Sequence, residues 1–203
     1  LPPNSVYDLP YLGKKATTLR EMGVISIQDI PDALEFNPNQ SKHIRAVKLG
    51  EPLIEKRAIK QRLDGLDHPL YFLDYETCRS AIPKNRGYHP QQQLVFKYSI
   101  HRLDNPGDVP VHSGFISSDK NDPCVPILER LSKEIGDIGS IVAWNDSFEK
   151  GRNEEMALLH PQHTEFLSAV NHRMNDLADI VSQGYYVHPG MNGSYSLKDV
   201  LPV

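Results

Sequence analysis

The sequence predicts an α/β fold, in which a mixed sheet with flanking helices follows a small helical N-terminal region. Residues 1–66 carry apolar residues at helical spacing and few strand patterns. Residues 67–203 instead alternate between strand-like and helix-like segments. With 203 residues, 39% of them hydrophobic and 24% charged, the chain is long enough for one medium domain plus an accessory region.

The N-terminal region, residues 1–66, is expected to be helical. The segment GKKATTLREMG places apolar residues three apart and stops at Gly23, and two more helical segments follow, interrupted at Gly50. We interpret this region as a helical connector. The alternative is a helix-hairpin-helix-like unit that grips a phosphate through backbone amides. Its basic stretch from Lys42 to Arg62 fits either a solvated helix face or a rim that faces nucleic acid.

The main domain, residues 67–203, begins with the strand PLYFLDYET, and residues 94–103 form a second strand. The turn DNPGD joins that strand to a third in residues 109–116, and the amphipathic helix DPCVPILERLSKEIG follows. A short buried strand in residues 140–145 precedes the helical stretches DSFEKGRNEEMALLH and HTEFLSAVNHRMNDLADIVSQ. Three antiparallel strands, then parallel strands and helices, is the element order of a ribonuclease H-like core.

Composition excludes several classes of protein. The net charge of −4 gives no overall basic field, although a local basic rim beside an acidic metal site remains compatible with nucleic acid. Two cysteines, Cys78 and Cys124, argue against a disulfide framework and a cysteine-rich zinc site. No apolar run is long enough to span a membrane and no signal peptide is present, so we expect a cytoplasmic protein with no membrane partner.

The histidines do not predict a zinc site. His160, His163 and His172 have no partner cysteine or acid at a convincing spacing, so we expect them on the surface. The chain begins with Leu and stops at SLKDVLPV, and we expect it to be an excerpt from a longer protein.

Two acids follow the first strand's apolar run. In YFLDYETCRS, Asp74 and Glu76 alternate along the strand and therefore project to the same face. Two carboxylates that close repel each other, and a divalent cation such as Mg²⁺ or Mn²⁺ relieves the repulsion. The alternative is that the strand ends at Leu73 and both acids are simply exposed.

A second acidic segment follows the short strand in residues 140–145. In VAWNDSFEKGRNEEMA, Glu149 lies in the first turn of a predicted helix. Asp146 as N-cap with Glu149 three positions later also fits a capping box, which explains the acid without a metal. Asn145 at the strand end either positions a phosphate or a water, or makes the turn.

These motifs resemble a known superfamily. LDYET followed by WNDSFE resembles the first two motifs of the DEDD 3′–5′ exonucleases, in which a D-x-E strand pairs with an N-x-x-F-D segment at a helix start. The wider context, with AIP, GYHPQQQLVFKYSIH, NDLADIV and GSYSLKDVLP, is similar to an uncharacterised bacterial family, domain of unknown function 2779. The resemblance spans about residues 68–203. Members of that family often carry a RecB-like nuclease region upstream.

The resemblance implies a two-metal exonuclease that acts on DNA or RNA ends with Mg²⁺ or Mn²⁺. By carry-over, Asp74, Glu76 and Glu149 are catalytic metal ligands, and Asp176 supports the metal site. Helix N-capping is the alternative role of Asp176. Asn145 is expected to contact nucleic acid. Tyr195 is another candidate for that role through base stacking, although loop packing explains it equally well.

Two departures from the superfamily pattern matter. Glu149 replaces an aspartate, and the superfamily's last aspartate falls after SLKDVLP, so we expect a domain truncated at its C-terminus that lacks one of four ligands. A fragment of this kind is expected to bind metal poorly and to have little activity. The alternative function is a non-catalytic nucleic-acid-binding or scaffolding domain with a degenerate nuclease site, and a phosphoesterase of small nucleotides is a third.

Overall fold

The computed structural model describes residues 1–84, 87–118 and 122–203. The chain divides into two compact units. The first unit combines Leu1–Leu63 with Ala178–Val203, and the second is the continuous stretch Asp64–Leu177. The division expected from the sequence, at residue 66, assigned the last stretch to the sheet domain. In the structure that stretch belongs to the unit that contains the N-terminal helices.

The second unit has a mixed five-stranded sheet with flanking helices, which confirms the predicted α/β class. The strands lie in the order β4-β3-β2-β5-β6. Their bounds are Leu70–Cys78 for β2, Leu94–Leu103 for β3, Val111–Ile116 for β4, Ser140–Ala143 for β5 and Met174–Asp176 for β6. β2 and β4 are both antiparallel to β3, whereas β5 is parallel to its neighbours β2 and β6.

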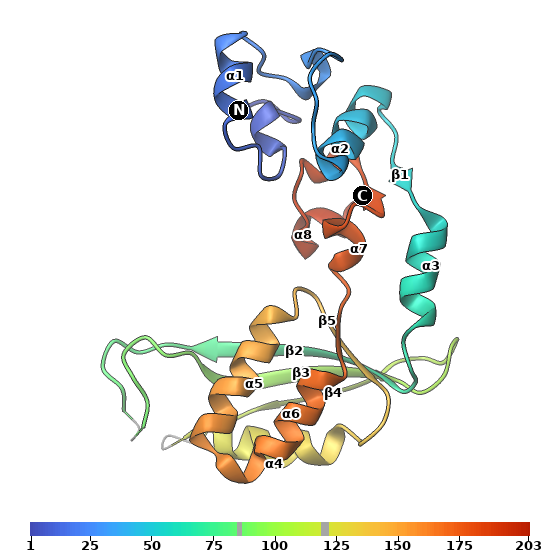
Figure 1. Cartoon of the computed structure of the whole chain (residues 1–203). Helices are drawn as coiled ribbons and strands as arrows, with labels where there is room; N and C mark the ends of the chain where they lie inside the picture. The colour runs from blue at the N-terminus through green and yellow to red at the C-terminus, as the bar shows by residue number, and fades with distance from the viewer. Residues whose placement is uncertain (85–86, 119–121) are drawn as a thin grey trace. The chain divides into compact units, whose positions relative to one another are not determined.

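Three helices accompany this sheet (Figure 1). They are α4 (Cys124–Glu134), α5 (Ser147–Leu159) and α6 (Thr164–His172), with the 3₁₀ turn η3 (Pro161–His163) between the last two. Alternate residues of β2, namely Tyr71, Leu73 and Tyr75, join side chains of all three helices in one buried core. Asp74 and Glu76 point to the opposite face of the strand and are exposed.

One stretch contains a strand that the sequence did not predict. HTEFLSAVNHRMNDLADIVSQ was expected to be mostly helical, and helices at Thr164–His172 and Asp179–Ser182 form most of it, but its middle forms β6. Met174 and Asp176 pair with Ile141 and Ala143 of β5. Three residues are too few for strand alternation to be visible in the sequence, and the apolar residues on either side continue a helical spacing. Pairing with a distant strand therefore decides the local structure.

The first unit is mainly helical. Its elements are η1 (Val6–Asp8), α1 (Lys15–Glu21), η2 (Ile27–Asp29), α2 (Pro38–Leu49), β1 (Leu53–Ile54), α3 (Lys56–Asp64), α7 (Asp179–Ser182), β7 (Tyr186–Val187), η4 (Pro189–Met191) and α8 (Leu197–Val200). The predicted helix end at Gly50 is confirmed, since Gly50 caps α2 in the left-handed conformation that glycine adopts without strain.

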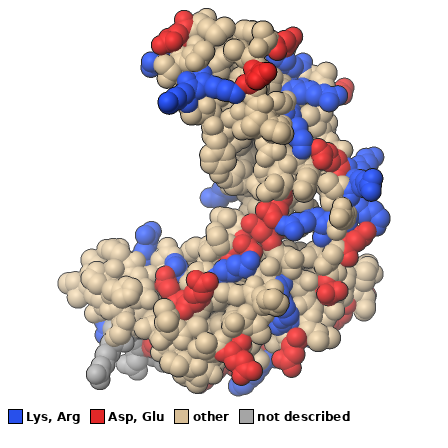
Figure 2. Space-filling model, in the orientation of Figure 1, with Lys and Arg blue, Asp and Glu red and all other residues tan. Residues whose placement is uncertain are grey.

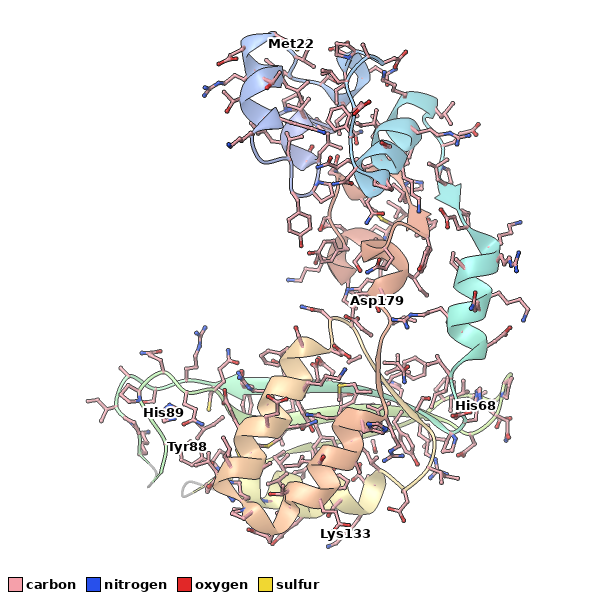
Figure 3. The ribbon with its side chains drawn as sticks, in the orientation of Figure 1. Met22, His68, Tyr88, His89, Lys133 and Asp179 are labelled. Atoms are coloured by element: carbon pink, nitrogen blue, oxygen red, sulfur yellow. The ribbon has the colours of Figure 1, made fainter. Side chains whose placement is uncertain are left out.

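Two stretches that are distant in sequence complete the first unit. β1 and β7 form an antiparallel pair in which Leu53 faces Val187. Asn39 of α2 donates a side-chain hydrogen bond to the Ser182 carbonyl at 3.1 Å. Arg62 forms an ion pair with Asp179, which Figure 3 labels at the start of α7. Among the described residues, no helix is both long and apolar enough to cross a membrane.

Candidate functional site

The acid pair of β2 lies where this strand runs past its neighbour. β5 pairs with β2 as far as Val142 and ends at Ala143, whereas β2 continues to Cys78. Asp74 and Glu76 therefore lie beyond the last β2–β5 pair, which joins Phe72 to Val142. Partial burial raises the pKa of Asp74, and the Glu76 charge raises it further, while Lys97 lowers it. The repulsion between neighbouring carboxylates that the sequence predicted thus raises the pKa of Asp74.

The turn between β5 and α5 is fixed by an acid of β6. Asn145 has a left-handed backbone, with φ of 64°, a conformation that asparagine tolerates better than most residues. Its backbone amide donates to Asp176 Oδ1 at 2.8 Å, and the Ser147 hydroxyl donates to Asn145 Oδ1 at 3.2 Å. Asp176 therefore ends a strand and holds this turn. It does not cap a helix, because the residue at the N-cap of α7 is Ala178.

Glu149 is the buried acid of the site. It lies in the first turn of α5 with 5% of its surface exposed, and its Oε2 has no hydrogen-bond partner among the described residues. Burial raises the pKa of Glu149 to about 7, and the charges of Asp74, Asp146 and Asp176 raise it as well, while its own backbone amide lowers it. Acids on β2, at the N-cap of α5 and on β6 therefore all raise the pKa of this one carboxyl group.

The capping-box interpretation of Glu149 is wrong. Asp146 occupies the N-cap position of α5, but its side chain makes no capping hydrogen bond, and its own backbone is already helical, with φ of −58°. The Asp146 carboxylate instead pairs with Lys150 at 2.5 Å. The sequence assigned Asp146 to capping alone and so missed its contribution to the charge around Glu149.

We call Asp74, Glu76, Asp146, Glu149 and Asp176 the acidic cluster. The charge of Glu76 raises the pKa of Asp74. The charges of Asp74, Asp146 and Asp176 raise the pKa of Glu149. In the part of the chain that the structure describes, however, no three of these carboxylates have oxygens all within 4.8 Å of one another. The cluster is therefore more open than the ligand shell of a single bound ion.

The donor set of the acidic cluster fits a hard divalent cation. Carboxylate oxygens are the ligands that Mg²⁺ and Mn²⁺ prefer in proteins. A cation would relieve both the unpartnered, buried Oε2 of Glu149 and the neighbouring negative charges that raise the pKa of this carboxyl group. Asp74, Glu76, Glu149 and Asp176 could each supply an oxygen, and closing the shell requires side-chain movement.

Tyr195 belongs to the first unit, whereas the other five predicted site residues belong to the second. It precedes α8 and is 40% exposed. With Tyr11, His43 and Tyr186 it lines a cavity of about 520 Å³, and the Tyr11 hydroxyl raises the pKa of Tyr195. The sequence pointed to Tyr195 but not to Tyr11 or His43, which lie far away along the chain.

The expectation for His160 was wrong. It is buried, with 8% of its surface exposed, and it lies beside Asp122 and Cys124. Sequence spacing did not reveal this group, because Asp122 and Cys124 lie at the start of α4 whereas His160 lies at the end of α5. No local motif could have revealed their proximity.

These observations define an α/β protein whose acidic cluster surrounds the start of α5, next to the ends of two parallel strands. The chain belongs to the family described as domain of unknown function DUF2779, whose model matches residues 71–196, more than half of the sequence. The match covers every residue of the acidic cluster as well as Asn145 and Tyr195. No curated protein and no solved structure matched the chain.

Proposed function

We propose that the second unit is a metal-dependent nuclease of the DEDD type, which hydrolyses phosphodiester bonds at the 3′ ends of DNA or RNA. The observation that carries the proposal is Glu149, a buried carboxyl group with an unpartnered oxygen at a helix start, within electrostatic reach of acids on two strands. Buried carboxyl oxygens are normally hydrogen-bonded, and one without a partner requires an explanation, which a bound cation would provide.

The sheet topology supports the same proposal. If the five strands of the second unit are numbered in chain order, they lie side by side in the order three-two-one-four-five. The second strand runs antiparallel to the first, and the other three run parallel to the first. This is the order expected of a ribonuclease H-like sheet, the fold that the DEDD resemblance implies. In this fold class, ligands bind beyond the carboxyl ends of the parallel strands. Asp74, Asn145 and Asp176 lie at or just after such strand regions.

The acids have two kinds of role in the proposal. Asp74, Glu76 and Glu149 are direct ligands, and Asp176 supports the site while it holds the Asn145 turn at 2.8 Å. Bound as a pair, Mg²⁺ or Mn²⁺ would activate a water and stabilise the leaving 3′ oxygen. Asn145 is placed to contact a substrate phosphate from the turn that Asp176 fixes.

The surface charge is consistent with a cation-assisted nuclease. On the face shown in Figure 2, Lys and Arg side chains are interspersed with Asp and Glu. The net charge of the chain is −4. Phosphate binding would therefore depend on local groups and on the divalent ions more than on a broad basic surface. Tyr195, together with Tyr11, offers aromatic rings for base stacking in the first unit.

The test is degradation of an end-labelled single strand by the full-length protein with Mn²⁺ or Mg²⁺. A strand labelled at its 5′ end should shorten progressively, and Asp74→Asn should lower the rate at least about 100-fold, because even second-shell changes at metal sites cost about 10- to 100-fold. Glu154→Gln is the matched control, since Glu154 is exposed on α5. Equal degradation by the wild type and Asp74→Asn would contradict the proposal.

A second candidate function is a non-catalytic nucleic-acid-binding domain with a degenerate site. The openness of the acidic cluster favours it, because no three of its carboxylates in the described residues come within 4.8 Å. This candidate predicts strand binding that is unaffected by Asp74→Asn and no turnover with either ion. Measuring binding and cleavage on the same labelled strand separates the two functions.

A further inference from the structure

A second group of potential metal ligands lies at the other end of α5. Asp122 and Cys124 are at the start of α4, and His160 is the residue that follows α5. Tyr88, labelled in Figure 3, belongs to the segment between β2 and β3. We call Asp122, Cys124 and His160, together with Tyr88, the Asp122 cluster.

The three potential ligands are close together. One carboxylate oxygen of Asp122, Cys124 Sγ and one ring nitrogen of His160 all lie within 4.8 Å of one another. Zinc binds sulfur, nitrogen and oxygen ligands at about 2.0–2.3 Å, so small side-chain rotations would bring all three atoms onto one ion. The acidic cluster contains no such group among the described residues.

Two of the three donors are held in place without a strong hydrogen bond. His160 Nε2 lies 3.5 Å from Asp122 Oδ2 and 3.4 Å from the Tyr88 hydroxyl, both longer than a normal hydrogen bond of about 2.7–3.2 Å. The Cys124 thiol donates weakly to the Val95 carbonyl at 3.4 Å, and its sulfur also interacts with the Tyr88 hydroxyl, so a bound ion would replace only weak contacts. A purely structural network would be expected to pair a buried imidazole more tightly.

The carboxylate is oriented by its neighbours. The Tyr88 hydroxyl donates to the Asp122 carboxylate and lies 2.9 Å from Oδ1 and 3.0 Å from Oδ2. The Cys124 backbone amide donates to Asp122 Oδ1 at 3.0 Å. Hydrogen bonds of this kind commonly fix the ligands of a metal from the second shell. Burial adds to the argument, since Cys124 is 1% exposed and His160 is 8% exposed.

The donor types select the ion. A thiol, an imidazole and a carboxylate form a borderline-soft set that suits Zn²⁺ and related transition metals, whereas the all-oxygen acidic cluster suits Mg²⁺ or Mn²⁺. Glu149 lies in the first turn of α5 and His160 follows its last residue. At about 1.5 Å per residue, the helix separates the two clusters by roughly 16 Å, so they cannot share an ion.

We propose that Asp122, Cys124 and His160 bind a Zn²⁺-type cation, with Tyr88 as a positioning residue that orients Asp122. Binding replaces the thiol proton with the metal and releases that proton to solvent. The bound ion joins the start of α4 to the end of α5. This proposal does not depend on whether the acidic cluster is a nuclease site.

The test is a titration of the metal-stripped full chain with Co²⁺, followed by Zn²⁺. We expect one equivalent of Co²⁺ to produce a thiolate-to-cobalt charge-transfer band, and Zn²⁺ to remove it. The band should vanish in Cys124→Ser and persist in Cys78→Ser, whose thiol is exposed. It should also persist in Asp74→Asn, because oxygen ligands of the acidic cluster give no thiolate band.

Two further variants keep the test valid if Cys124→Ser does not fold, which near-ultraviolet circular dichroism reports. His160→Gln retains the thiol and should weaken Co²⁺ binding at least about 100-fold, and Tyr88→Phe should weaken it about 10- to 100-fold. A native chain with no charge-transfer band overturns the proposal. So does a band lost in Cys78→Ser but kept in Cys124→Ser, or one unaffected by His160→Gln.

Discussion

Glu149 combines a buried position with several acidic neighbours, and both raise its pKa to about 7. In the unfolded chain a glutamate titrates near about 4.3. Between these pH values the folded protein keeps a proton that the unfolded chain has lost. The free energy of unfolding therefore falls as the pH rises through this window, and above pH 7 the ionised carboxylate destabilises the metal-free fold.

Glu149→Gln should stabilise the protein above pH 7, because the amide has no charge to bury. The expected gain is on the order of 2 kcal/mol at pH 8, and it should disappear near pH 4, where the wild-type group is protonated in both states. Urea unfolding with a chelator present measures it. Glu154→Gln, on the exposed side of α5, is the control and should show no pH-dependent difference. Equal stability of the wild type and Glu149→Gln at pH 8 would count against the assigned burial.

Individual site residues were predictable to different degrees. Asp74 and Glu76 follow from strand alternation, which is a local property of the sequence. The position of Glu149 in the first helical turn was also predictable, but its burial depends on packing that the sequence does not display. Asp146 was given the wrong role, because its spacing to Glu149 matches a capping box whether or not the hydrogen bond forms.

At the scale of elements, α5 is fixed to its neighbours by a chain of hydrogen-bonded side chains. The Tyr75 hydroxyl of β2 donates to Asn153 Oδ1 of α5 at 2.9 Å, and Asn153 Nδ2 donates to Asn171 Oδ1 of α6 at 2.7 Å. Asn171 Nδ2 then donates to the Lys150 carbonyl at 3.2 Å. This chain sets the position of α5, and therefore of Glu149 in its first turn.

Asn153→Ala should destabilise the protein by about 2–3 kcal/mol, because it leaves the buried Tyr75 hydroxyl and the half-buried Asn171 side chain without their hydrogen bonds. Chemical denaturation measures the loss. Tyr75→Phe should cost less in the Asn153→Ala background than in the wild type, since the hydroxyl has already lost its partner there. Strictly additive losses would show that the two side chains are not coupled.

The elements with a strong pattern were predicted from the sequence, and those with few residues were not. β3 has the predicted bounds, Leu94–Leu103, because ten residues suffice to show alternation. β6, β1 and β7 have two or three residues each and exist through pairing with partners distant in sequence. The Asp122 cluster was missed for the same reason, as its members lie at the ends of separate helices.

For the whole molecule, the first unit is built from two separate stretches of sequence, and the second unit is the continuous stretch between them in the sequence. The sequence offers no signal for this arrangement, because the pairing of Leu53 with Val187 joins segments on either side of the entire sheet domain. Val187 and Met191 are buried in the first unit, whereas α8 has no buried residue. Residues 178–191 are therefore the part of the C-terminal stretch that packs with the N-terminal helices.

Deletion of residues 178–203 should loosen the first unit and leave the second folded. Hydrogen exchange should increase strongly in peptides from α2, which contacts β7 and η4, and change little in β2 and β3. Deletion of residues 197–203 is the control, and it should have a small effect, because α8 contributes no buried residue. Unchanged protection of α2 in the longer deletion would show that the N-terminal stretch is stable without its partner.

The division of the chain also has a consequence for the order of events on the ribosome. The sheet domain is complete once Leu177 has emerged, since all five of its strands are contiguous in sequence. The segment that contains β1 is made before the second unit, yet β1 finds its partner only after Val187 has been synthesised. This segment must therefore remain unaggregated while more than a hundred residues are added.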